Sequence, residues 1–381
     1  MKFGTRILHT GNEIDPATGA VSVPIYQVST FKQERADAFG PYDYARSGNP
    51  TRDALEATIA SLEGGVRGFA FSSGMAAISS VFLIFSPGDH LVVCEDVYGG
   101  THRVLTRLFS RLGIEASFVD FTDLSKVEAA LRDNTRAIFA ESPSNPLLKI
   151  TDLQAVAALS RERGLISIVD NTFMTPYLQR PLALGIDIVV HSATKYLGGH
   201  SDLIAGLAVA ADPRIAEQIR FIQNSFGAVL GPQDSWLLLR GMKTLKARMD
   251  LHQSGAGKLA AWLAGREEVK KVYFPGLPDH PGREIHEKQA EGPGGIVSFR
   301  MKDEKTARML MEKVKLPALA VSLGAVESII SYPLTMSHAS MHPDHRLRAG
   351  VTGELIRLSV GLEDPDDLIE DLSQAMIEYG R

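Results

Sequence analysis

The chain has 381 residues, of which 44% are hydrophobic and 22% are charged, and its formal net charge is −5. This composition is ordinary for a globular protein of roughly two or three domains and argues against a disordered chain. Because the sequence has no basic block, nucleic acid is not an expected partner.

The N-terminal stretch MKFGTRILHTGNEIDP has no apolar core of signal-peptide length. No apolar run approaches the ~20 residues that cross a bilayer. The single cysteine, Cys94, permits no disulfide within the chain, which fits a reducing compartment. We therefore expect a cytoplasmic protein without a membrane partner.

Residues 1–45 are irregular and punctuated by Gly, Pro and Asn. They are expected to form an N-terminal arm that wraps a neighbouring subunit or covers its own domain.

From about residue 64, short apolar runs alternate with helical patterns. Strands are predicted in GFAF, HLVVCE, EASFVDF, RAIFAE, LISIVD and DIVVHS. Strands that alternate with helices predict an α/β fold with a mainly parallel sheet covered on both faces. Residues 46–245 are assigned to this domain, in which a ligand is expected beyond the carboxyl ends of the strands.

The pattern changes near residue 245. SGAGKLAAWLAGREEVKKVYFPG predicts a helix that leads into a strand, and GGIVSFRM and LIRLSVGLE predict two further strands. Residues 246–381 are therefore assigned to a second, smaller α/β domain.

Lys195 follows the predicted strand IDIVVHSAT, between two hydroxyl residues and a pair of glycines. Desolvation at a strand end lowers the pKa of a lysine and frees its amine as a nucleophile for Schiff-base chemistry. Ser192 and Thr194 supply hydroxyl donors for an anionic oxygen. A lone lysine at a strand end is more often a solvated charge, so the interpretation depends on its surroundings.

Two further features lie at predicted strand ends. Asp170 ends LISIVD, where a carboxylate can hold a protonated ring nitrogen, although taken alone it fits a helix cap or a turn residue better. In FSSGMAA, Ser73, Gly74 and Met75 form a strand-to-helix turn whose free N–H groups suit a phosphate. Together with Lys195, these features meet the needs of pyridoxal phosphate.

The chain resembles the pyridoxal-phosphate (PLP) enzymes of cysteine and methionine metabolism, the cystathionine lyases and synthases. The resemblance runs nearly end to end and rests on seven stretches: YDYARSGNPTRDALE, AFSSGMAA, EDVYGGTHR, ESPSNPLLKITD, VDNTFMTPYLQRPLALGIDIVVHSATKYLGGHSD, GPQDSWLLLRGMKTL and LIRLSVGLED. It implies fold type I of the PLP-dependent transferases, the aspartate aminotransferase-like fold.

By this resemblance, Lys195 forms the Schiff base with the cofactor and then carries protons, while Tyr98 stacks on the cofactor ring and its phenol takes part in proton transfer. The resemblance implies the following further residues around the ring and phosphate: Gly74, Met75, Asn145, Asp170, Thr172, Ser192 and Thr194.

The same resemblance implies a substrate-carboxylate clamp of Asn145, Ser322 and Arg357, since an arginine fork bonds a carboxylate in a bidentate manner. Tyr44 and Arg46 are implied to reach the phosphate in a neighbouring subunit. The active unit would then be a homodimer, and the assembly a tetramer of two such dimers.

The expected substrate is a small amino-acid thioether. Relatives that act at the γ-carbon often carry a glutamate before the serine of SLG, where this chain has Val321, and Arg103 is then free for the distal carboxylate of the substrate. Methionine γ-lyases can also have valine there, but they typically place a cysteine where this chain has Gly100. Cystathionine β-lyase is therefore favoured, with γ-lyase as the alternative, followed by γ-synthase and methionine γ-lyase.

Other site classes have less support. His338, His342 and His345 cluster in a loop-like stretch with Pro343, and no metal site is expected there. The chain has neither G-x-G-x-x-G after the first strand nor G-x-S-x-G. A regulator that binds PLP without catalysis would be expected to lack Lys195, Tyr98 or Arg357, and all three are present.

Overall fold

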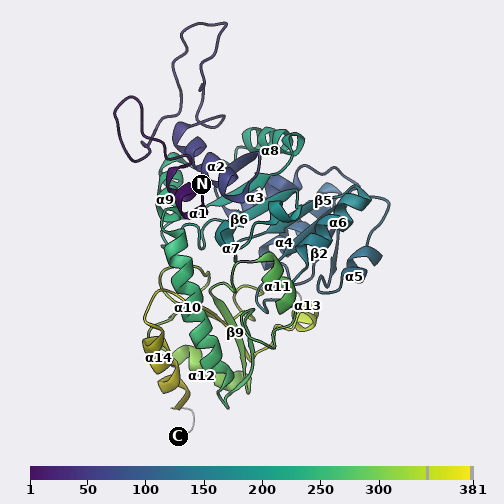
Figure 1. Ribbon diagram of the computed structural model, residues 1–381. Helices are drawn as coiled ribbons and strands as arrows, with labels where there is room; N and C mark the ends of the chain where they lie inside the picture. The colour runs from purple at the N-terminus through teal and green to yellow at the C-terminus, as the bar shows by residue number, and fades with distance from the viewer. Residues whose placement is uncertain (340–342, 378–381) are drawn as a thin grey trace.

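The computed structural model describes residues 1–339 and 343–377 (Figure 1). Its larger sheet has seven strands in the order β1-β7-β6-β5-β4-β2-β3. In chain order they are β1 (Arg67–Phe71), β2 (His90–Cys94), β3 (Glu115–Val119), β4 (Thr135–Glu141), β5 (Ile166–Asp170), β6 (Ile188–Ser192) and β7 (Gly206–Ala210).

This sheet is mainly parallel, as predicted. Strand β7 runs antiparallel to both of its neighbours, β1 and β6, and the other neighbouring pairs are parallel. Six of the strands match predicted runs, whereas β7 was not predicted.

Both faces of the sheet are buried. In β1, Phe69 and Phe71 pack into one apolar cluster and the intervening Ala70 into another, because successive side chains of a strand point to opposite faces. The surrounding helices are α2 (Pro50–Glu63), α3 (Gly74–Phe82), α4 (Gly99–Arg107), α5 (Leu124–Ala129), α6 (Leu153–Arg163), α7 (Thr175–Leu178), α8 (Pro213–Phe226), α9 (Pro232–Met242) and the 3-10 turns η1 (Phe109–Leu112) and η2 (Pro181–Leu184).

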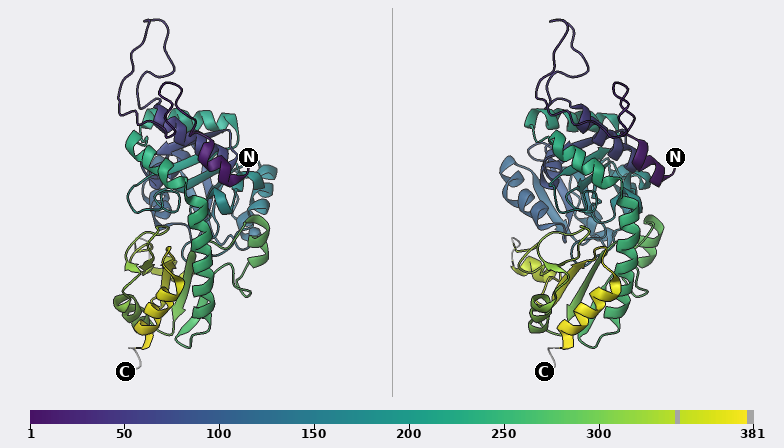
Figure 2. Two further views of the ribbon diagram at one scale, coloured as in Figure 1. Left: turned by 60° about the vertical axis from the view of Figure 1, so that its left-hand side comes forward. Right: turned by 90° about the vertical axis from the view of Figure 1, so that its left-hand side faces the viewer.

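A long helix, α10 (Leu245–Ala264), runs from this part of the molecule to a second sheet (Figures 1 and 2). That sheet has the order β10-β11-β12-β9-β8 and is antiparallel except for the pair β10 and β11. In chain order, the strands of this sheet and the helices between and after them are β8 (Val269–Tyr273), α11 (Arg283–Gln289), β9 (Ile296–Met301), α12 (Glu304–Lys313), β10 (Ala318–Leu319), β11 (Ile329–Ser331), α13 (Pro343–Arg348), β12 (Leu355–Ser359) and α14 (Pro365–Ile377). The domain limits 46–245 and 246–381 stay an interpretation, although α10 begins at Leu245.

The N-terminal segment contains one short helix, α1 (Phe3–His9), and then an extended loop that projects beyond the body of the molecule in all views (Figures 1 and 2). Apolar side chains are exposed along it, at Val21, Ile25, Val28 and Phe39. In the described part of the chain, no helix has both the length and the apolarity to cross a membrane.

Candidate active site

A cavity of about 540 Å³ lies at the carboxyl end of the larger sheet. Thirteen of the fifteen residues predicted for the site line it: Gly74, Met75, Tyr98, Arg103, Asn145, Asp170, Thr172, Ser192, Thr194, Lys195, Val321, Ser322 and Arg357. These positions span the chain from the first strand–helix turn to β12. The fold therefore gathers one site from segments far apart in sequence.

Lys195 lies in the turn after β6, and its amine Nζ is 2.5 Å from the hydroxyl Oγ of Ser322. Burial, together with the positive charge of Arg357, lowers the pKa of Lys195 to about 8. The neutral amine is therefore accessible near physiological pH. The buried side chain is not a solvated surface charge, and its amine has the properties that a nucleophile or a proton carrier needs.

Asp170 ends β5 directly opposite Glu141, which ends β4. The carboxylate of Asp170 accepts hydrogen bonds from the backbone N–H (3.0 Å) and the hydroxyl (2.5 Å) of Thr172. Burial and the adjacent Asp170 hold the pKa of Glu141 well above its usual range. Burial raises the pKa of Asp170 as well, but the hydrogen bonds from Thr172 oppose this rise, so Asp170 holds the negative charge of the pair more readily than Glu141 does.

Helix α3 begins in the same cavity. Ser73 is its N-cap and accepts a hydrogen bond from the backbone N–H of Ala76 (3.0 Å), while the first N–H groups of a helix have no intrahelical partner. A Cβ at Gly74 would lie 2.8 Å from the Cβ of Ser192, so only glycine allows this close packing. The Ser192 hydroxyl thus lies beside the helix N-terminus, an arrangement suited to a phosphate.

Tyr98 precedes α4 and is 41% exposed within the single chain. Its backbone N–H donates to Oε2 of Glu141 (3.0 Å), which anchors the start of the helix. A Cβ at Gly100 would lie 2.4 Å from Cε1 of the Tyr98 ring and 2.8 Å from Sδ of Met75. Glycine at position 100 therefore gives the ring its place over the cavity.

Arg357 is buried on β12, and burial lowers its pKa to about 10, so it remains a cation at neutral pH. Its Nη1 donates to Oδ1 of Asn145 (2.9 Å) and its Nη2 to the backbone oxygen of Ser322 (2.7 Å). The buried Nε has no hydrogen-bond partner among the described residues. The guanidinium therefore has donor capacity left for an anion.

Val321 and Arg103 line the same cavity, and Val321 is 66% exposed. Within the described ranges, the Arg103 guanidinium forms no ion pair with a carboxylate. A cation without an acidic partner beside an apolar side chain can receive a carboxylate from a ligand.

Tyr44 and Arg46 do not line this cavity. The Arg46 guanidinium lies 5.7 Å from the Tyr44 ring, and its Nη1 donates to the backbone oxygen (2.5 Å) and to Oδ1 (3.1 Å) of Asn224 on α8. Their predicted role in a neighbouring subunit stays a prediction.

The histidine stretch shows no metal centre in the part described. His338 is buried and His345 lies in α13, whereas His342 is outside the described residues. No group of three or more potential metal ligands occurs among the described residues.

The cavity fits pyridoxal phosphate on several independent features. Lys195 has a lowered pKa that suits an aldehyde, Asp170 is a charged acceptor for a ring nitrogen, and the start of α3 with Ser192 suits the phosphate. Each feature lies at the end of a strand of one sheet.

Comparison with known proteins decides the family. The profile of the Cys/Met metabolism PLP-dependent enzymes matches residues 4–377. This chain belongs to that family. Pyridoxal phosphate is accordingly its cofactor, and the fold is that of the type I PLP-dependent enzymes.

Several relatives cover nearly the whole chain. Cystathionine beta-lyase MetC of Bacillus subtilis (strain 168) is 55% identical over 98% of this chain and 96% of its own length. Cystathionine gamma-lyase of the same organism is 53% identical over 99% of each chain. The crystal structure of cystathionine gamma-lyase from Lactobacillus plantarum complexed with L-serine superposes with a TM-score of 0.97, at 48% identity and 99% coverage of each chain.

The structure adds residues that were not predicted for the site, among them Glu141, Phe173 and Ile204. Glu141 ends the predicted strand RAIFAE, so the strand-end rule that selected Asp170 also applied to it. Phe173 and Ile204 carry no chemical signal in the sequence.

Proposed function

We propose that this member of the family is a carbon–sulfur lyase that converts L-cystathionine and water to homocysteine, pyruvate and ammonia by β-elimination. Relatives named cystathionine beta-lyase, at 48–55% identity, support the proposal. The observation that carries it is the cavity that has two cations, Arg357 and Arg103, of which Arg103 has no acidic partner among the described residues.

The geometry of the site supports the following proposed contacts with the cofactor. Bound pyridoxal phosphate would supply an electron sink that stabilises negative charge at the α-carbon of an amino acid. Lys195 would take and return protons at that carbon, since its pKa of about 8 lets it exist in both forms. Asp170, fixed by Thr172, would hold the ring-nitrogen proton, and Tyr98 would cover one face of the ring.

The proposed substrate contacts use the two arginines. Arg357, positioned by Asn145 and Ser322, would bind the α-carboxylate of cystathionine. Arg103 would bind the distal carboxylate and so orient the thioether. The Ser322 hydroxyl, 2.5 Å from the Lys195 amine, would hold that amine toward the α-carbon.

The alternative is γ-elimination, which yields cysteine and 2-oxobutyrate. It has support from the relatives named cystathionine gamma-lyase, whose similarity nearly equals that of the β-lyases. Val321 supplies no carboxylate at this position, neither one that would pair with Arg103 nor one that would bind the distal ammonium of the substrate. This arrangement favours β-elimination.

The proposal includes a cytoplasmic homo-oligomer, a tetramer of two active dimers. Exposed apolar side chains on the projecting arm, and Phe221 and Phe226 on α8, provide surface for a second copy. The buried thiol of Cys94 fits a reducing compartment.

The test is to incubate the holoenzyme briefly with L-cystathionine and to quantify pyruvate and 2-oxobutyrate by chromatography. We expect pyruvate and homocysteine as the main products. A predominance of 2-oxobutyrate would establish the γ-lyase alternative, and turnover of neither bond would reject the lyase proposal.

A further inference from the structure

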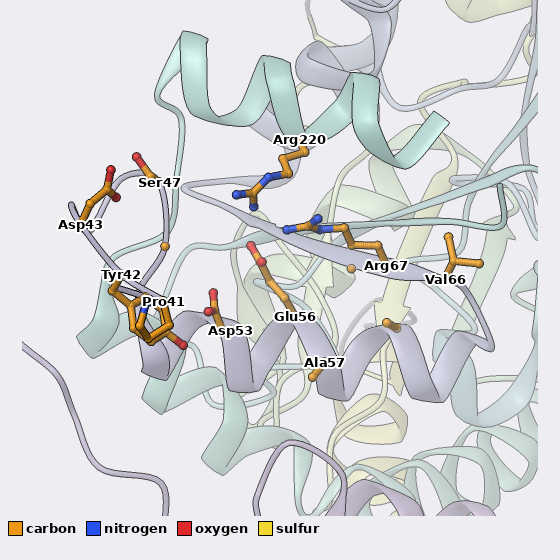
Figure 3. A pocket seen from close by; sticks show the side chains of 13 residues that line it. Pro41, Tyr42, Asp43, Ser47, Asp53, Glu56, Ala57, Val66, Arg67 and Arg220 are labelled. Atoms are coloured by element: carbon orange, nitrogen blue, oxygen red, sulfur yellow. The ribbon is translucent and has the colours of Figure 1, made fainter. Parts of the chain in front are cut away.

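A second cavity, of about 320 Å³, lies between the end of the N-terminal arm, α2, β1 and α8. It shares no lining residue with the candidate active site. Figure 3 shows the guanidinium groups of Arg67 and Arg220 converging over this cavity, from β1 and α8 respectively. Asp53 on α2 and Asp43 on the arm lie on its other side.

These opposite charges do not neutralise one another. Neither Arg67 nor Arg220 forms an ion pair within the described ranges, and neither do Asp43 and Asp53. Asp43 accepts a hydrogen bond from the backbone N–H of Tyr44 (2.6 Å), but it has no cation partner there. Two arginines and two aspartates without ion-pair partners in the described ranges therefore line one cavity.

Glu56 also lines the cavity, but it forms no ion pair with Arg67 or Arg220 in the described ranges. Its Oε1 accepts hydrogen bonds from the backbone N–H of Ala70 (2.9 Å) and from Gln223 (2.8 Å), and Arg52 lies 3.6 Å away. Burial raises the pKa of Glu56, which weakens it further as a counter-ion for the two free arginines. The arginines are thus left for a ligand.

We propose that this cavity binds the zwitterion of a free α-amino acid with an apolar side chain. Arg67 and Arg220 would hold the carboxylate, and Asp43 and Asp53 would hold the ammonium. An inorganic anion would leave the two aspartates facing it, so a ligand with both charges fits better. Ala60, Val66 and Gly68 line the cavity without charge, which suits an apolar side chain.

The occupant would bridge the arm to the body of the subunit. Asp43 and Ser47 belong to the same arm stretch as Tyr44 and Arg46, and Arg67 begins the strand that leads to the turn at Ser73. Binding would therefore restrain the arm segment 41–48. This proposal does not rest on which carbon–sulfur bond the enzyme breaks.

The test measures binding of L-norleucine, which has no leaving group for elimination, to the holoenzyme by equilibrium dialysis. Because this amino acid also fits the catalytic cavity, Arg357→Leu is measured in parallel. We expect a site that survives Arg357→Leu and weakens at least about tenfold in Arg220→Gln and in Arg67→Gln. Arg214→Gln, also on α8 but paired with Asp212 outside the cavity, is the matched control and should bind as the wild type does.

Two chemical probes make the test independent of the variants' folding. N-acetyl-L-norleucine lacks the ammonium and L-norleucinamide lacks the carboxylate, and both should bind this site at least about tenfold more weakly than L-norleucine. Hydrogen exchange of residues 41–48 should slow when L-norleucine binds Arg357→Leu. The proposal is overturned if Arg220→Gln binds like the wild type, if all binding is lost with Arg357→Leu, or if the acetylated probe or sulfate binds as tightly as L-norleucine.

Discussion

The amine Nζ of Lys195 lies 2.5 Å from the hydroxyl Oγ of Ser322, a residue 127 positions later in the chain. Ser322 has a φ of 92°, a backbone conformation that is costly for a residue with a side chain. The surrounding contacts hold it there, since its backbone oxygen accepts a hydrogen bond from Arg357 (2.7 Å). One strained residue thus links the proposed nucleophile to the proposed carboxylate clamp.

We predict that Lys195→Ala lowers elimination activity by at least ~1,000-fold, because it removes both the covalent attachment point and the proton carrier. The visible absorbance of the bound cofactor should disappear as well. Lys246→Ala, which removes an exposed lysine paired with Asp250, is the control and should leave both properties unchanged. Turnover by the Lys195 variant near the wild-type rate would remove this lysine from the mechanism.

The lowered pKa of Lys195 predicts how the apoenzyme recombines with the cofactor at different pH values. The neutral amine is the nucleophile, so the rate should rise as the pH increases through about 8 and then level off. At pH 7 about one-tenth of the lysine is neutral, against about one in 3,000 for an unperturbed lysine. Stopped-flow absorbance from pH 6.5 to 9.5 measures the midpoint.

The variant Arg357→Leu tests the cause of this pH profile. Its charge is the second cause of the lowered pKa of Lys195, after burial. Arg357→Leu should therefore move the midpoint to higher pH. A wild-type rate that rises throughout this pH range without levelling off would show that the site does not activate the lysine.

Gly100→Ala should displace the Tyr98 ring, because the added Cβ would lie 2.4 Å from its Cε1 atom. We expect kcat/KM to fall on the order of 10- to 100-fold, since small misplacements of an active-site group carry such costs. Gly257→Ala is the matched control, because a Cβ there meets no atom within 4 Å. Equal activity of the two variants would show that the ring position tolerates a side chain at residue 100.

Much of this site follows from strand ends that are visible in the sequence. Asp170 and Lys195 were predicted because buried apolar runs precede them, and the structure brings both to one cavity. Strand β7 was not predicted, because three of the five residues in GLAVA are glycine or alanine, which have little strand propensity. Its place depends on antiparallel pairing with two strands. These are β1, which is distant in sequence, and β6, which runs in the opposite direction.

The contacts across the cavity had no local signal either. The hydrogen bond from Arg357 to Asn145 joins residues 212 positions apart, and the one from Lys195 to Ser322 joins the two parts of the molecule. Only the family resemblance pointed to Asn145, Ser322 and Arg357. Tertiary packing, not spacing in the sequence, determines such distances.

The proposed shared site predicts complementation between two inactive variants. Arg46 does not line the cavity of its own chain. The substitution Arg46→Ala should therefore weaken cofactor binding only if Arg46 contacts the cofactor of a neighbouring subunit. Hybrids of Arg46→Ala and Lys195→Ala chains contain one site with both residues intact, and they should regain activity. Arg35→Ala, another arm arginine, pairs with Asp37 on the surface and should behave like the wild type. Fully exchanged hybrids without recovery would contradict the shared site.

Val321→Glu should raise the share of γ-elimination. The new carboxylate would lie in the cavity with Arg103, where it can pair with that cation or hold the distal ammonium of cystathionine. Either contact weakens the hold of Arg103 on the distal carboxylate and changes the alignment of the carbon–sulfur bonds. Hydrogen bonds to charged groups contribute about 1.5–3 kcal/mol, so we expect the ratio of 2-oxobutyrate to pyruvate to increase roughly 10-fold or more.

Val321→Gln is the matched control for this change, because it adds similar volume and polarity without charge. If the product ratio shifts equally in both variants, the cause is the shape of the cavity rather than the carboxylate. If Val321→Glu changes KM for cystathionine but leaves the product ratio unchanged, residue 321 contributes to binding and not to the choice of bond. A shift confined to the glutamate variant assigns the selectivity to competition for Arg103.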